Sequence, residues 1–217
     1  MRRRAPDLAA LRARMVEEQL ARRGIRDQRV LDAMATVPRE AFVGDDDRDL
    51  AYEDAPLGIG FGQTISQPYM VALICEVAGI RPRDRVLDIG TGSGYQAAVL
   101  AELAREVHTI ERIPELAERA GERLAAAGYG DVTVHVGDGS LGLPEHAPFD
   151  AITVAAAAPE PPGTLYDQLV PGGRLVVPVG DRANQRLEVV VRSPEGPAVA
   201  RSVPCRFVPL VGEEGYR

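Results

Sequence analysis

The stretch VLDIGTGSG, residues 86–94, decides the fold of this chain. Its apolar residues belong to an expected strand over 85–89, and its glycines lead into an expected helix over 94–104. A buried strand that runs through glycine-rich backbone into a helix typically begins a βαβ unit, in which the loop faces a bound ligand. The stretch therefore indicates an α/β sheet with a ligand site at its edge, without identifying the ligand.

Strands and helices alternate outward from this stretch. The expected strands cover 85–89, 107–111, 132–136, 149–154 and 174–179, and the expected helices cover 68–79, 94–104, 114–127 and 163–170. Such alternation predicts parallel strands covered by helices on both faces. Only the short segment GDRANQ separates strand 174–179 from strand 186–192, too few residues for a crossover, so this pair is antiparallel. The last expected strand, over 198–208, pairs with a neighbouring strand at this edge of the sheet.

The predicted fold class is α/β: a Rossmann-like, doubly wound, mostly parallel seven-stranded sheet with an antiparallel C-terminal edge and an N-terminal helical addition. The addition contains a helix over 7–23, which Gly24 ends, and a second helix from Asp27 to Val37. Residues 44–67 look like a loop. We expect residues 1–67 to pack on a core of residues 68–217, giving one structural domain overall.

Composition excludes several classes of function. A net charge of −7 argues against a nucleic-acid groove, and no apolar run approaches the roughly 18 residues of a membrane span. The basic N-terminus has no apolar stretch behind it, so we expect no signal peptide. Two distant cysteines are typical of reduced thiols in a cytoplasmic protein. All 25 cationic residues are Arg, which excludes Schiff-base chemistry on Lys and a P-loop lysine.

Acidic residues narrow the choice of ligand. Counted from Gly92, GSGYQA satisfies the dinucleotide pattern G-x-G-x-x-A, so glycine spacing alone does not exclude NAD. Asp88 ends the first strand, and two like charges at about 4 Å repel by roughly 4 kcal/mol, so a pyrophosphate is disfavoured there. A cationic ligand such as S-adenosylmethionine is favoured. Glu111 could accept its ribose hydroxyls, and Asp138 its adenine amino group, from the ends of the next two strands.

Several motifs together resemble one family. GQTISQP at 62–68, VLDIGTGSGYQAAVLA at 86–101, GDG at 137–139 and RFVPLVG at 206–212 are similar to the protein-L-isoaspartate O-methyltransferases, and the similarity extends through most of the chain. The resemblance implies methyl transfer from S-adenosylmethionine to the free α-carboxylate of L-isoaspartyl residues in damaged proteins and peptides, a repair reaction. It also implies a cofactor site formed by Asp88, Gly90, Gly92, Ser93, Glu111, Asp138 and Gly139.

The same resemblance makes Ser66 the active-site serine, with Thr64, Ile65 and Gln67 around it to bind substrate. From the residues alone, two interpretations are open, because Pro68 begins a helix and Ser66 stands just before it. Ser66 could cap this helix, a role worth about 1 kcal/mol. Alternatively, the helix N-terminus could seat a substrate carboxylate, with Ser66 positioning it.

The sequence leaves alternative functions open. A related enzyme could methylate an ordinary aspartyl side chain of one dedicated peptide. An NAD-dependent oxidoreductase is disfavoured by Asp88, and a non-catalytic ligand-binding module is disfavoured by the motif GQTISQP.

Residues 58–67 and the segment RSVPCRFVPL are candidates for contacts with a peptide backbone. His108 and His135 fall within strands and His146 in a loop, so we expect no histidine cluster and no metal. The resemblance implies a monomer.

Overall fold

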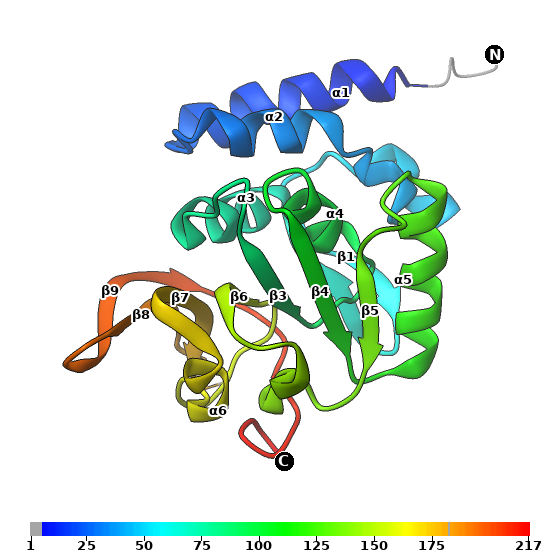
Figure 1. Cartoon of the computed structure of the whole chain (residues 1–217). Coiled ribbons are helices and arrows are strands. Elements are labelled where there is room, and N and C mark those ends of the chain that lie inside the picture. Colours follow the sequence, from blue (N-terminus) through cyan, green and yellow to red (C-terminus); the bar gives the residue numbers. More distant parts are fainter. Residues whose placement is uncertain (1–5, 182) are drawn as a thin grey trace.

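A seven-stranded sheet forms the centre of the molecule (Figure 1). The computed structural model describes residues 6–181 and 183–217. Within them the sheet has the spatial order β5-β4-β3-β6-β7-β8-β9. The strands are β3 (Arg85–Ile89), β4 (Glu106–Glu111), β5 (Thr133–Val136), β6 (Phe149–Val154), β7 (Leu169–Gly180), β8 (Gln185–Ser193) and β9 (Gly196–Cys205).

Strand directions confirm the predicted mixed sheet. The strands β5, β4, β3, β6 and β7 run parallel to one another, whereas β8 pairs antiparallel with both β7 and β9. The connection between Gly180 and Gln185 is too short for a parallel crossover, so the chain reverses direction there.

Helices cover both faces of the sheet, as a doubly wound fold requires. The helices α3 (Pro68–Ala78), α4 (Tyr95–Ala101) and α5 (Pro114–Ala126) contribute to one hydrophobic cluster, and α6 (Gly163–Asp167) contributes to another. The neighbouring residues Val86 and Leu87 of β3 are fully buried, one in each cluster, because successive side chains of a strand face opposite sides. In the described part of the chain, no helix combines the length and apolar character needed to cross a bilayer.

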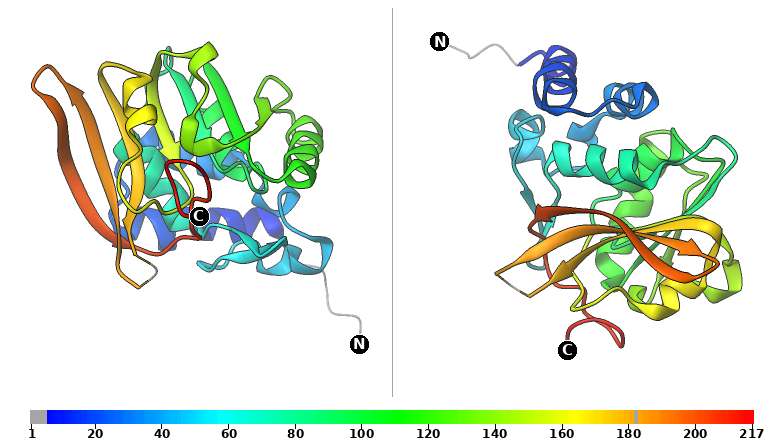
Figure 2. Two further views of the ribbon diagram at one scale, coloured as in Figure 1. Left: turned by 90° about the horizontal axis from the view of Figure 1, so that it is seen from below. Right: turned by 90° about the vertical axis from the view of Figure 1, so that its left-hand side faces the viewer.

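The N-terminal helices form as expected. The first begins as α1 (Leu8–Arg14), continues as a π-helical segment (Met15–Leu20) and a 3₁₀ turn (Ala21–Arg23), and ends at Gly24, which has φ +101°. The second, α2 (Gln28–Thr36), is capped by Asp27, whose carboxylate accepts the backbone N–H of Arg29 at 3.0 Å. Figure 2 (right) shows both helices stacked outside α3, with the C-terminus on the far side of the sheet.

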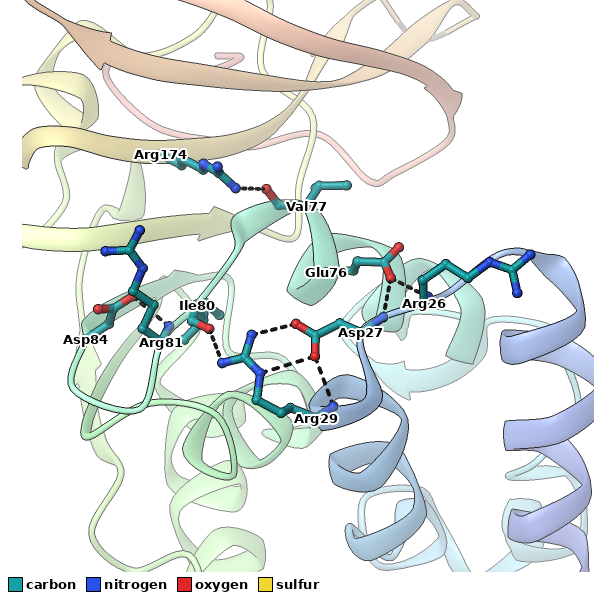
Figure 3. A network of polar contacts seen from close by, with 9 residues as sticks. All are labelled: Arg26, Asp27, Arg29, Glu76, Val77, Ile80, Arg81, Asp84 and Arg174. Atoms are coloured by element: carbon teal, nitrogen blue, oxygen red, sulfur yellow. Dashed lines mark hydrogen bonds and ion pairs between the residues drawn. The ribbon is translucent and has the colours of Figure 1, made fainter.

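Polar contacts tie the N-terminal helices to the core (Figure 3). The Glu76 carboxylate of α3 accepts the backbone N–H groups of Arg26 and Asp27, and the Arg29 guanidinium donates to the carbonyl of Ile80 at 2.8 Å. One hydrophobic cluster also contains side chains from α2, α3 and α4. On this packing we propose that the described residues of 1–67 and of 68–217 form a single structural domain; residues 1–5 and 182 lie outside the described part.

The expectation of an irregular loop over 44–67 is wrong in part. The segment contains a 3₁₀ helix (Asp45–Leu50) and an antiparallel hairpin of β1 (Leu57–Gly60) and β2 (Gln63–Ile65). The turn of the hairpin places Phe61 at φ +53° with its side chain 53% exposed, between two glycines that also have positive φ. Because glycine tolerates this region of backbone space, the glycine-rich sequence forms a tight hairpin and not an open loop.

The connection from β6 to β7 also differs from the prediction. Helix α6 ends at Asp167, not at residue 170, and β7 begins at Leu169. Leu169 pairs with Phe149 at the start of β6, and both side chains are fully buried. Burial beside β6 thus extends the strand at the expense of the helix.

Candidate active site

A cavity lies at the carboxyl ends of β3 and β4, where open α/β sheets bind ligands. Segments that are far apart in sequence form its walls, among them residues 63–66, the glycine loop after β3, residues 110–113 after β4, and residues 208–211. The predicted site residues that line it are Thr64, Ile65, Ser66, Gly90, Gly92, Ser93, Glu111 and Gly139. Gln67, Asp88 and Asp138 do not line this cavity.

A second cavity adjoins the first. Its lining includes Gln67, Met70 and Arg206, and it shares Thr64 and Ser66 with the first cavity. The hydroxyl-bearing residues before α3 therefore stand between two spaces, one against the glycine loop and one against the C-terminal segment. Arg206 is the basic residue of this second lining, so an anionic group would be favoured there.

Glu111 binds the backbone of the glycine loop. One carboxylate oxygen accepts the N–H of Gly92 at 2.9 Å, and the other accepts the N–H of Ile113 at 3.0 Å. The N–H groups of Gly90 and Thr91 donate to the carbonyl of Ile110, so they too are already paired. The Glu111 carboxylate thus already accepts the loop N–H that a pyrophosphate would need, which disfavours an anionic dinucleotide. Each Glu111 oxygen still has a lone pair that can accept from a hydroxyl group.

Asp88 acts differently from the sequence-based interpretation. Its side chain is fully buried beneath the loop and accepts hydrogen bonds from Gln96 at 2.7 Å and Thr153 at 2.9 Å, with Thr109 at 3.3 Å. Burial raises the pKa of this carboxyl to about 6, although the hydrogen bond from Gln96 and those from the threonines oppose the rise. These three donors hold the carboxylate beneath the loop, so Asp88 does not line the cavity, and its direct contact with the ligand stays a prediction.

Asp138 also has a structural contact that the sequence did not reveal. One of its oxygens accepts the N–H and the hydroxyl of Ser140, and the other accepts the N–H of Glu213 at 2.8 Å. Burial acts to raise its pKa, but these hydrogen bonds together lower the pKa below its ordinary value. The carboxylate therefore fastens the C-terminal segment to the end of β5, and only its neighbour Gly139 reaches the cavity.

Ser66 is not a helix cap. Gln67 is the N-cap residue of α3, and no side chain of the N-cap hydrogen-bonds to the helix. The carboxylate of Asp54 instead accepts the N–H of Tyr69 at 3.2 Å and also pairs with Arg23. Because an acid of this chain already occupies the N-terminus of α3, a substrate carboxylate would have to bind the neighbouring hydroxyls of the exposed Thr64 and the half-buried Ser66. The helix-cap interpretation of Ser66 is therefore excluded, and its positioning role stays a prediction.

The C-terminal segment contributes wall residues that the sequence analysis only partly anticipated. The N–H of Ala157 donates to Val208 at 2.8 Å, and the N–H of Leu210 donates back to Ala157 at 2.7 Å. This pairing holds residues 208–211 against the end of β6, where Ala155 and Ala156 also line the cavity. The sequence contained one signal for the part of this wall that follows β6: the carboxyl end of β6 was expected at the same sheet edge as those of β3 and β4.

The expectation that the histidines form no cluster is wrong. His108, His135 and His146 each offer a ring nitrogen within 4.8 Å of the other two. Burial, followed by the neighbouring His108 and His146, lowers the pKa of His135 below its ordinary value. None of the three lines either cavity described above.

Comparison with known proteins agrees with this geometry. Residues 11–215 match the family model of protein-L-isoaspartate(D-aspartate) O-methyltransferase. A protein-L-isoaspartate O-methyltransferase of Hyperthermus butylicus is 57% identical over 94% of this chain and 90% of its own length. One from Roseiflexus sp. is 53% identical over 97% of this chain and 96% of its own length.

Solved structures are similar as well. A protein-L-isoaspartate O-methyltransferase superposes with a TM-score of 0.83 at 29% identity, over 94% of this chain and 66% of that one. A Plasmodium falciparum structure described as the same kind of enzyme, in complex with S-adenosyl-L-homocysteine, has a TM-score of 0.81 at 27% identity, over 93% of this chain and 99% of that one.

The doubly wound sheet, the glycine loop and the cavity at the strand ends define an S-adenosylmethionine-dependent methyltransferase. The matched family model covers nearly the whole chain, and the relatives share more than half of its residues. The chain belongs to the protein-L-isoaspartate(D-aspartate) O-methyltransferase family.

Proposed function

We propose that this chain transfers the methyl group of S-adenosylmethionine to the α-carboxylate of L-isoaspartyl residues in damaged proteins and peptides. One observation carries the proposal: Ser66 and Thr64 line both the cavity at the glycine loop and the adjoining cavity. A donor in the first space and a carboxylate in the second would therefore meet at these two residues.

The residues around the first cavity fit the cofactor. Glu111 has lone pairs for ribose hydroxyls, and Ser93 and the glycines 90, 92 and 139 form its walls. S-adenosylmethionine supplies a methyl group on a cationic sulfur. The buried carboxylate of Asp88 favours that cation from beneath the loop, and Asp138 contributes by holding the C-terminal segment in place.

The substrate carboxylate is proposed to bind at the junction of the two cavities. The hydroxyls of Thr64 and Ser66 can donate to it, and Arg206, the basic residue of the second cavity's lining, would attract its charge. Ile65 is 4% exposed and lines the first cavity only, while Gln67 lines the second only. On these positions we propose that Ile65 belongs to the apolar wall and Gln67 to the substrate side.

The chemistry then needs few protein groups. An α-carboxyl group has a pKa of about 3.5, so at neutral pH it is already the anionic nucleophile and needs no general base. The leaving thioether is neutral and needs no acid. Because opposite charges cancel in the transition state, exclusion of water and in-line alignment supply much of the acceleration. Ser66 accordingly has a positioning role: its hydroxyl orients the carboxylate oxygen toward the donor.

Many different damaged proteins can be accepted if recognition uses the peptide backbone. The hairpin β1–β2 and the segment before residue 208 border the second cavity and offer backbone groups for an extended peptide. We further propose a cytoplasmic monomer that acts on isoaspartyl proteins without nucleic acid as a partner, in keeping with the net charge of −7.

The test is a methyl-transfer assay with labelled S-adenosylmethionine and three peptides that differ only in carrying isoaspartate, aspartate or asparagine at one position. We expect base-labile label on the isoaspartyl peptide alone. Label on the aspartyl peptide alone would indicate the related enzyme that tailors one dedicated peptide. Absence of label together with tight binding of NADH would favour an oxidoreductase and overturn the proposal.

A further inference from the structure

The three histidines of the sequence converge on one place outside the active site. His108 lies in β4, His135 in the adjacent β5, and His146 in the 3₁₀ turn Pro144–His146 before β6. Figure 1 shows β4 and β5 side by side at the edge of the sheet. The ring centroids are 4.5 to 5.3 Å apart, so three segments bring their only imidazoles together.

A carboxylate orients the central ring. Glu106, two residues earlier on the same face of β4, lies 2.9 Å from Nε2 of His108 and also pairs with Arg85 at 3.1 Å. A charged carboxylate requires a donor, so in the neutral ring Nε2 carries the hydrogen and Nδ1 has the lone pair. Nδ1 is the atom that faces His135, 3.1 Å from its Nε2. A carboxylate behind a histidine whose other nitrogen faces its neighbours is the usual support of a metal-binding imidazole.

The spacing suits coordination with small movements. Two nitrogens bound to a tetrahedral Zn²⁺ at about 2.05 Å lie about 3.4 Å apart. The pair His108 and His135 is already near this separation, and each histidine offers a ring nitrogen within 4.8 Å of the others. His108 is 5% exposed, whereas His135 and His146 are only half-buried, so an ion could enter from solvent and the outer two rings could turn toward it.

We propose that His108, His135 and His146 form a binding site for one divalent first-row transition-metal ion, with Glu106 supporting His108 from behind and water as the fourth ligand. Three imidazoles favour Zn²⁺, Ni²⁺ or Cu²⁺, whereas Mg²⁺ and Ca²⁺ prefer oxygen ligands. The bound ion would cross-link β4, β5 and the turn before β6. His108 lies three residues before Glu111 on β4, about 10 Å along the strand. A bound ion would therefore stabilise the sheet and take no part in methyl transfer.

The experiment titrates tag-free protein with ZnCl₂ by calorimetry and with CoCl₂ by absorption spectroscopy, because an affinity tag would bind the same ions. We expect one ion per chain, a tetrahedral Co²⁺ spectrum without thiolate charge-transfer bands, and a higher thermal midpoint with Zn²⁺. His146→Gln, a half-buried position, should lower Zn²⁺ affinity at least tenfold while the apo protein keeps its circular dichroism. Glu106→Gln should lower affinity by about 10- to 100-fold.

The matched control is Cys205→Ser, which removes the more accessible of the two thiols and should leave Zn²⁺ binding unchanged. Three results would overturn the site: no Zn²⁺ binding at millimolar concentration, equal affinity in wild type and folded His146→Gln, or loss of binding in Cys205→Ser. The first would mean that the imidazoles only pack and hydrogen-bond to one another.

Discussion

Replacement of Asp88 by Asn tests the buried acid beneath the glycine loop. The wild-type carboxylate has no exposure to water and depends on donors from Gln96, Thr153 and Thr109. Asn has nearly the same shape, its oxygen can accept from Gln96 and Thr153, and the Thr109 hydroxyl can accept from its amide group while it donates to the residue 88 carbonyl, so the variant should fold. In unfolding experiments without cofactor, the substitution then reports the titration of this side chain.

The structure sets the size and sign of the effect. Burial raises the pKa of Asp88 from 3.8 to about 6 in the folded protein. Because the folded state holds the proton more tightly, the stabilising contribution is fully present below about pH 4 and is lost as the pH rises through about 6. At 1.36 kcal/mol per pKa unit the full loss is about 3 kcal/mol, of which about 1.4 kcal/mol falls between pH 5 and pH 8.

The assay is urea unfolding of wild type and Asp88→Asn at a series of pH values from 5 to 8. The difference between their free energies of unfolding should shift by about 1.4 kcal/mol across this range, with wild type relatively more stable at pH 5. Asp131→Asn, at an exposed position, is the matched control and should shift little. A difference that stays constant with pH would refute the reasoning, because the carboxyl would then have no raised pKa.

The remaining predictions concern residues that line the cavities. Ser66→Ala should lower kcat by about tenfold to 10²-fold in steady-state kinetics, because the hydroxyl positions the carboxylate. The free energy of unfolding in urea should change by less than about 1 kcal/mol, since Ser66 caps no helix. A normal kcat would contradict the positioning role. Glu111→Gln leaves one partly buried N–H without an acceptor, so it should cost about 1 kcal/mol in urea unfolding and weaken S-adenosyl-L-homocysteine binding in calorimetry. The substitution Glu115→Gln, at an exposed position, should do neither. Arg206→Gln should raise KM for an isoaspartyl peptide severalfold without changing S-adenosyl-L-homocysteine affinity; an equal effect of Arg201→Gln, which lines neither cavity, would argue against a local role.

The sheet could be predicted from sequence because its strands carry strong local signals. Strands 85–89 and 149–154 match the structure residue for residue, since each is a short apolar run between polar or glycine-rich boundaries. The hairpin over Leu57–Ile65 was missed because its strands are short and rich in glycine, without clear alternation. Its turn depends on three consecutive residues of positive φ, 60–62, which glycine spacing alone does not specify.

The site could be predicted in position but not in side-chain direction. Asp88, Glu111 and Asp138 all stand at strand ends as expected, yet only Glu111 lines the cavity. The donors that turn Asp88 inward, Gln96 and Thr153, come from α4 and β6, so their convergence appears only in the folded chain. The histidine cluster was missed for the same reason, because its members come from separate segments.

A crystal structure of the chain with S-adenosyl-L-homocysteine and an isoaspartyl peptide tests the central claim most directly. We predict ribose hydroxyls on Glu111, the sulfur at the junction of the two cavities, and the peptide α-carboxylate within hydrogen-bond distance of Ser66 or Thr64. A nucleoside bound away from the glycine loop, or a carboxylate held far from both hydroxyls, would contradict the account.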